Sequence, residues 1–261
     1  MNSAHMHKKQ SGFTLLEMLV SVMVFLLISG TIFQLLTNTQ KQSQNDSQMR
    51  DTFQEARLGL DQIVRDINDA GYPPANHFTV LPAVTGYAQT PVAWSPNYVA
   101  GIACTVGGTC TTPGPYDIIF EEDYDGSGTV KWVRYQLQGT TLWRGVTPKV
   151  AGIDPVTATN IAGVMYPYVQ NVMNNAPAAQ IGQIRATYPN MFPGANPVPI
   201  FTYAFDNNTG TAGCVSAVSS PCNIRDVQVT LIVQTPQRDA QNAVLRLVEL
   251  NGRGHRLNPN L

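Results

Sequence analysis

One long apolar run, which follows a short polar leader, dominates the N-terminal part of the chain. No charged residue occurs between Met18 and Gln40. The apolar stretch from Phe13 to about Leu36 exceeds the ~20 residues that a helix needs to cross a bilayer. A cleaved secretory signal has a shorter apolar stretch, roughly 7 to 15 residues, that ends in small residues at the cleavage site. The pattern therefore predicts a membrane-spanning helix over residues 13–36.

The helical pattern continues through residues 37–71 as an amphipathic segment. Its apolar residues recur at steps of three and four, at Met49, Phe53, Ala56, Leu60, Ile63, Ile67 and Ala70. This stripe lasts about three heptads, which is short for a coiled coil and favours packing against the domain that follows in the chain. No proline interrupts the pattern before Gly71, where Gly71, Pro73 and Pro74 end it.

Short alternating segments after residue 72 predict antiparallel strands. The turn-rich stretch "DYDGSGT" separates "YDIIFEE" from "VKWVRYQL", and further strands are expected at "TTLWRGV", "IFTYAFDN", "DVQVTLIVQT" and "AVLRLVEL". Residues 72–115 are rich in Pro and Gly and predict irregular loops, and the proline-rich residues 148–199 predict an exposed loop region. We therefore expect an α+β fold, with the amphipathic stripe packed on an antiparallel sheet of a β-rich globular domain at residues 72–261.

Charge adds an orientation for the spanning helix and excludes one class of partner. Lys8 and Lys9 precede the apolar run, so the leader is expected in the cytoplasm and the domain outside. The formal net charge is −1, with no broad basic field, and no nucleic-acid partner is predicted. We interpret the small cluster of Arg253, His255 and Arg256 as a solvated tail.

The cysteines occur as two close pairs, both after the apolar run. Even number and short spacing favour two local disulfides in an oxidising compartment, formed among Cys104, Cys110, Cys214 and Cys222. The connectivity stays open. A four-thiolate metal site is the alternative, but neither pair has the two-residue spacing typical of such sites and no histidine lies nearby.

Glu17 is the one acid near the start of the apolar run. A carboxylate in the apolar part of a spanning helix costs on the order of 2.5 to 3.5 kcal/mol, and residues of this kind usually mark a function. A simple membrane anchor gives no reason for Glu17. We therefore expect a group of opposite charge to pair with it.

The stretch "KKQSG" followed by "FTLLEMLVSVMVFLL" resembles the class III signal of type IV pilins and type II secretion pseudopilins. The resemblance implies that prepilin peptidase cuts after Gly12 and that Phe13 becomes the methylated N-terminus. It also implies that Glu17 is the acidic residue that is conserved in this family and that acts in filament assembly. Cleavage creates an ammonium at the edge of an apolar helix, and Glu17 of a neighbouring subunit would neutralise it in the filament core.

The segment "EARLGLDQIVRDINDAGY" resembles PilW-like minor pilins in particular. This implies the type IV pilin fold, with a leader at residues 1–12, a helix at 13–71 and an extracytoplasmic domain at 72–261. The implied partners are other major and minor pilins, prepilin peptidase and the inner-membrane assembly platform. The implied location is the bacterial inner membrane, with the domain in the periplasm or outside, and then a pilus or pseudopilus at the cell surface.

Two other assignments stay open beside the PilW-like one. A J-like minor pseudopilin of a type II secretion system shares the processing and the fold. A membrane-tethered extracytoplasmic enzyme or binding module would use the helix only as an anchor, although Glu17 argues against it. No phosphate loop, dinucleotide-binding glycine motif, nucleophile elbow or zinc-protease helix occurs, so neither enzyme activity nor a cofactor is predicted.

One segment resembles the first half of a calcium-binding loop. Asp123, Asp125 and Ser127 occupy its first, third and fifth positions and Gly128 its sixth, but the final position, which should be Glu, is Arg134. A hairpin turn has the same composition. We predict no metal site, and calcium binding at this turn stays an alternative.

Overall fold

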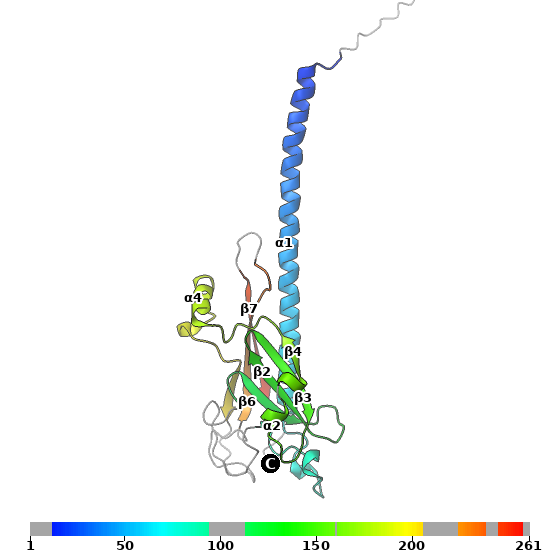
Figure 1. Ribbon diagram of the computed structural model, residues 1–261, viewed down its shortest axis with the longest axis vertical. Coiled ribbons are helices and arrows are strands. Elements are labelled where there is room, and N and C mark those ends of the chain that lie inside the picture. Colours follow the sequence, from blue (N-terminus) through cyan, green and yellow to red (C-terminus); the bar gives the residue numbers. More distant parts are fainter. Residues whose placement is uncertain (1–11, 94–112, 160, 206–223, 239–244, 258–261) are drawn as a thin grey trace, which may run out of the picture.

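The computed structural model describes residues 12–93, 113–159, 161–205, 224–238 and 245–257. One long helix, α1 (Leu15–Asp69), extends alone over its N-terminal part (Figure 1). At its C-terminal end it packs on the globular part of the chain that follows residue 71, which we call the head. The helix continues unbroken from the apolar into the amphipathic half, as the absence of proline predicts. It ends just before Gly71, which takes a left-handed conformation with a φ of 86°.

Within the residues that the structure describes, the head contains two antiparallel sheets instead of the one expected. The first has the order β1-β2-β3-β4, with β1 (Asp117–Glu122), β2 (Lys131–Gln138), β3 (Thr141–Pro148) and β4 (Met165–Val169). The second has the order β5-β6-β7, with β5 (Phe201–Phe205), β6 (Ile224–Gln234) and β7 (Leu247–His255). The long helix packed on antiparallel sheets confirms the predicted α+β fold.

Short helical segments lie between α1 and the first strand and between later strands. They are η1 (Ala75–His77), η2 (Val84–Gly86), α2 (Pro155–Ala158), α3 (Ile161–Val164), α4 (Ala178–Thr187) and η3 (Pro193–Ala195). Residues 72–93 form loops with isolated bridges, as their composition predicts.

A single core joins α1 to both sheets. The predicted stripe of α1 supplies Ala56, Leu60, Ile63, Ile67 and Ala70, all buried. The sheets contribute alternate residues of their strands, such as Ile118 and Phe120 on β1 and Val227, Val229, Leu231 and Val233 on β6. The helix packs most closely on β7, where a Cβ added at Gly252 would lie 2.9 Å from Leu60 Cδ1. Glycine at this position lets the strand and the helix approach.

Many residues of the segment 148–199 are exposed, but the segment also contains α2, α3, β4 and α4 and covers part of the outer face of each sheet, so the prediction of an exposed loop region was only partly right. Near α2, Val156 and Ala158 pack on Ile119 and Trp132 of the four-stranded sheet. On the three-stranded sheet, Ile181 of α4 joins a second buried cluster with Met173, Ala176, Phe192, Ile232 and Leu247. Strands with both faces buried need a cover on each side, which alternation on one face does not reveal.

The C-terminal residues were also predicted incorrectly. The last strand begins later than expected and runs to His255, so Arg253 and His255 of the basic cluster lie on β7 and Arg256 follows it directly, instead of all three forming a solvated tail. Arg253 Nη2 lies 2.8 Å and His255 Nδ1 2.6 Å from the carboxylate of Asp226 on β6. The side chain of Arg256 is buried.

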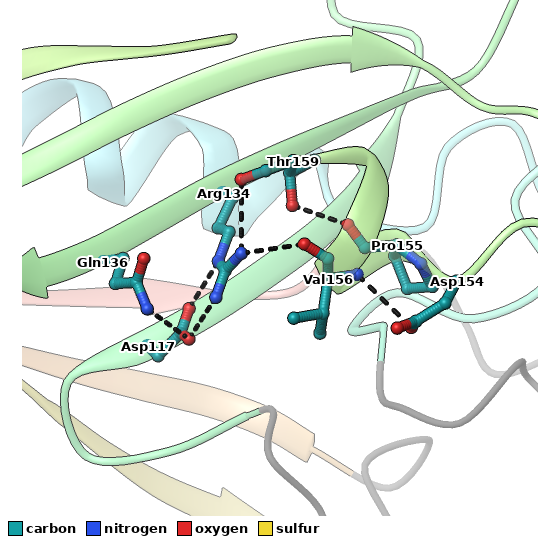
Figure 2. Close-up of polar contacts among 7 residues, drawn as sticks. All are labelled: Asp117, Arg134, Gln136, Asp154, Pro155, Val156 and Thr159. Atoms are coloured by element: carbon teal, nitrogen blue, oxygen red, sulfur yellow. Dashed lines mark hydrogen bonds and ion pairs between the residues drawn. The ribbon is translucent and has the colours of Figure 1, made fainter. Parts of the chain in front are cut away.

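Arg134 joins two strands of the four-stranded sheet and fastens the covering segment α2 to it. Figure 2 shows Arg134 of β2 bonded through Nε and Nη2 to the Asp117 carboxylate of β1, at 2.9 and 2.6 Å. Its Nη1 donates to the carbonyl oxygens of Val156 and Thr159, which fixes α2 against the sheet. Burial raises the pKa of Asp117, and the hydrogen bond and charge of Arg134 oppose this shift.

Candidate functional site

The start of α1 is shaped by a reciprocal contact between Thr14 and Glu17. The Glu17 backbone N–H donates to Thr14 Oγ1 at 3.3 Å, and the Thr14 N–H and hydroxyl both donate to Glu17 Oε2 at 3.1 Å. This arrangement is a capping box, in which two backbone donors at a helix start gain partners. Glu17 therefore caps its own helix in the single chain, a role that the sequence analysis did not assign.

The apolar half of α1 has no cover within the chain. Its large side chains from Leu15 to Leu36 are exposed, and Phe13 before them is 80% exposed. Within the described ranges, α1 is the one helix long and apolar enough to cross a membrane. A continuous apolar surface of this extent requires lipid or protein around it.

The peptide bond between Gly12 and Phe13 lies just before this helix. Gly12, Phe13 and Thr14 precede the first helical residue, and all three are exposed. A Cβ added at Gly12 would meet no other atom within 4 Å. The fold itself therefore places no demand for glycine at residue 12.

The calcium-like turn uses its acids to fold itself. Asp123 accepts hydrogen bonds from the backbone N–H groups of Ser127 and Gly128, at 3.0 and 2.8 Å. Asp125 forms an ion pair with Lys131 of β2. In the part of the chain that the structure describes, no group of three or more His, Cys, Asp or Glu side chains is placed to hold a metal ion.

The four cysteines are the remaining predicted positions. Cys104, Cys110, Cys214 and Cys222 lie outside the described residues, so the disulfides stay a prediction.

A set of buried charges holds α1 to the head, and the sequence analysis missed it. Asp66 of α1 lies 3.0 Å from Arg144 Nη2 of β3 and accepts the hydroxyl of Tyr135 at 2.5 Å. Burial and the Asp66 carboxylate raise the pKa of Tyr135 well above its ordinary value, so this hydroxyl stays a donor. A second buried pair, Lys149 with Glu121 at 3.1 Å, lies on the outer side of the four-stranded sheet. The ion pair between Asp66 and Arg144 fixes the orientation of α1 relative to the four-stranded sheet.

A family model decides the nature of the N-terminal segment. The prokaryotic N-terminal methylation motif matches residues 7–33, which include Gly12, Phe13 and Glu17. The chain carries a type IV pilin-like prepilin signal. This prepilin signal implies processing by prepilin peptidase, anchoring in a membrane before assembly, and assembly with other pilins. No curated protein and no solved structure gives a significant match to the chain.

The prepilin signal and the helix geometry agree on one arrangement. The signal ends within the exposed apolar half of α1, and the buried stripe begins only at Ala56, more than 20 residues later. The chain thus separates a segment for membrane and filament contacts from a segment that packs on the head. Together they describe a pilin or pseudopilin-like precursor.

Proposed function

We propose that this protein is a PilW-like minor pilin, made as a prepilin and incorporated into a type IV pilus or its tip and priming complex. Its work is structural: pilus assembly, adhesion and pilus-dependent motility, with no catalytic activity. The observation that carries the proposal is the prepilin signal on a helix whose N-terminal half has no cover within the chain.

Several features support the processing step in this proposal. The bond after Gly12 lies in an exposed, non-helical segment, where a membrane peptidase reaches it without unfolding α1. Because the fold does not require glycine there, the peptidase is the natural reason for it. The new ammonium on Phe13 would lie four residues before Glu17, at the edge of the apolar helix.

The position of Glu17 supports an assembly role. Its Oε2 is held by Thr14, while Oε1 receives no hydrogen bond from any described residue. That oxygen is available to the ammonium of a neighbouring subunit. In the low dielectric of a filament core, the carboxylate and the ammonium are each unfavourable when unpaired. Their pairing lowers the free energy and therefore favours one axial register between subunits.

The test is mass spectrometry of the mature protein recovered from membranes and from sheared filaments. We expect an N-terminal peptide that begins at methylated Phe13, together with loss of residues 1–12. A mature chain that begins elsewhere, or that keeps its leader in a strain with active peptidase, would contradict the assignment.

A J-like minor pseudopilin of a type II secretion system is the second candidate, because the same signal and fold serve both systems. Deletion of the gene distinguishes them. A minor pilin predicts loss of surface pili with normal protein secretion, whereas a pseudopilin predicts accumulation of secreted enzymes in the periplasm with normal pili. A tethered enzyme or binding module is the more distant alternative, and it predicts that both systems remain intact.

A further inference from the structure

The three-stranded sheet has an open edge at β7, which pairs with β6 on one side only. Just after β7, the Arg256 N–H donates to the Arg225 carbonyl, so the backbone groups of Arg256 and of every second residue before it face β6. The residues between these positions face the other way. The N–H and C=O groups of Glu249, Asn251 and Arg253 therefore point away from the sheet.

No described group covers this edge of β7. The backbone groups of Glu249, Asn251 and Arg253 make no hydrogen bond within the described residues, and all three side chains are exposed. At the end of the strand α1 closes the edge, because Asn68 Oδ1 accepts the His255 N–H at 2.9 Å. Each of the three open residues thus offers one donor and one acceptor to a further strand.

The other edges of the two sheets carry a cover or a block. Beside β1, the Ala93 N–H donates to the Ile119 carbonyl at 2.8 Å. Beside β5, the Phe201 N–H donates to the Pro115 carbonyl at 3.0 Å. On β4, Pro167 has no N–H to offer. Sheet edges are normally protected in this way because an unpaired strand recruits other strands, and β7 lacks that protection.

An apolar strip lies beside the open edge. Val248 and Leu250 share the face of β7 that is turned toward α1 and are half-buried, whereas Leu231 on the neighbouring strand β6 is fully buried. Val64 of α1 is also half-buried, and its Cγ2 would lie 3.0 Å from a Cβ added at Gly252. A strand added to β7 would cover this strip with its own apolar side chains.

The charges on the other face of β7 indicate what that strand carries. Arg253 and His255 are both bonded to the Asp226 carboxylate. Glu249 accepts the side-chain amide of Asn251 at 3.0 Å and forms no ion pair in the part of the chain that the structure describes. A Lys or Arg opposite Glu249 would form a favourable cross-strand pair.

The direction of β7 limits the source of the strand. β7 runs along α1 in the same direction, since Leu60 lies beside Gly252 and Asn68 beside His255 (Figure 1). Two β7 edges paired antiparallel about a two-fold axis would point their α1 helices in opposite directions, which anchoring in one membrane does not permit. We propose that an extended segment of a different pilin subunit adds to β7 as an antiparallel strand, with apolar residues on the strip and a basic residue opposite Glu249.

Strand addition at β7 rests on assembly with other pilins, which the prepilin signal implies, and it applies equally to a pilus and a pseudopilus. Its failure would leave cleavage after Gly12 and methylation of Phe13 unchanged. Mass spectrometry of the N-terminus therefore tests the proposed function separately from the edge of β7.

Hydrogen–deuterium exchange of the full chain, resolved by residue, measures the state of this edge. In micelles, the amides of Glu249, Asn251 and Arg253 are expected to exchange at least about tenfold faster than those of Leu250 and Gly252, which face β6. In sheared filaments that contain the chain, the three edge amides are expected to slow by about tenfold or more.

Two variants test the role of the edge in assembly. Asn251→Pro removes the central outward N–H and leaves the bonds between β6 and β7 in place. We expect it to fold and to reach the membrane but to enter filaments about tenfold less than wild type, measured by immunoblotting. Asn251→Ala is the matched control, since it loses the same side chain and keeps the N–H. Glu249→Lys leaves the backbone unchanged and is expected to lower incorporation severalfold.

Melting temperatures report whether each variant is folded. Edge amides that exchange as fast in filaments as in micelles would overturn the inference, and so would normal incorporation of the folded Asn251→Pro and Glu249→Lys variants. Slow exchange of the edge amides in dilute micelles would mean that the chain covers its own edge. Exchange that slows as the chain is concentrated in micelles would assign the edge to a second copy. Both results contradict addition of a strand from a different pilin.

Discussion

Asp66 on α1 and Arg144 on β3 form an ion pair in the core of the protein, with Arg144 Nη2 3.0 Å from Asp66 Oδ2. The same carboxylate accepts the Tyr135 hydroxyl, and Gln62 Nε2 of α1 donates to its other oxygen at 2.6 Å. The pair therefore locks the rotation of α1 about its axis relative to the four-stranded sheet. A filament subunit needs this, because rotation of the helix would change which side it shows to its neighbours.

Loss of the Asp66 carboxylate should destabilise the head strongly. Asp66→Ala leaves the Arg144 guanidinium buried without its counter-charge, and removal of one partner from a buried pair typically costs about 3–5 kcal/mol. Urea unfolding of the full chain in micelles measures the change. Asp61→Ala is the control, since Asp61 is exposed on the same helix and its loss should change stability by about 0.5 kcal/mol or less. Equal effects of the two variants would show that the pair has no special role.

Because Glu122 is buried, we expect the free energy of unfolding to depend on pH. Its carboxyl oxygens are buried and have no hydrogen-bond partner among the described residues. Burial, and then the charges of Asp66 and Asp69, raise the pKa of Glu122 from 4.5 to about 9. The folded chain thus keeps a proton that the unfolded chain releases between these values. Stability from this group is complete below pH 4.5 and falls by about 1.4 kcal/mol per pH unit up to about pH 9.

Glu122→Gln tests this directly, because the amide cannot ionise. We expect the variant to gain stability relative to wild type as the pH rises from 5 to 9, measured by urea unfolding at several pH values. A difference that stays constant over this range would mean that Glu122 is ionised in the folded protein.

Glu17 is predicted to act in assembly through its charge. Glu17→Ala should leave membrane insertion intact and abolish incorporation into filaments, measured by immunoblotting of membrane and sheared-filament fractions. Glu17→Gln refines the test, since glutamine can still complete the capping box with Thr14. If the charge is required, the glutamine variant fails as the alanine variant does.

Thr14→Val is the matched control for helix capping. It removes the Thr14 hydroxyl that contacts Glu17 but keeps the carboxylate. We expect incorporation to continue, with a loss of helix stability of about 1 kcal/mol. Incorporation that is normal in Glu17→Gln and lost in Thr14→Val would assign the role of Glu17 to capping and overturn its proposed pairing.

Gly254 on β7 is expected to tolerate no side chain. A Cβ there would overlap the side chain of Ile67 on α1, which is itself fully buried. Gly254→Ala should therefore destabilise the chain by about 1–3 kcal/mol, because the helix and the strand must separate. Gly182→Ala in α4 is the control, since no atom lies within 4 Å of the added Cβ and alanine favours the helix by about 1 kcal/mol. Thermal melting of both variants compares them.

Local patterns in the sequence predicted the features that depend on neighbours along the chain. Helix α1 was predicted from the apolar run, the stripe from Ala56 to Ala70 and the stop at Gly71. This was possible because the period of a helix depends only on residues a few positions apart in the sequence. Alternation predicted β1, β2, β3 and β6 to within a few residues. The prepilin signal is also local, so the sequence alone located it at Gly12, Phe13 and Glu17, and the matched methylation motif covers the same residues.

The tertiary structure decided the features that join distant residues. Asp66 and Arg144 are 78 positions apart, and nothing in either segment distinguishes a buried charge from an exposed one. The cover of α4 on the three-stranded sheet and the close approach of Gly254 to Ile67 likewise depend on how the elements pack. Sequence periodicity specifies which face of an element is buried, but only packing specifies what that face meets.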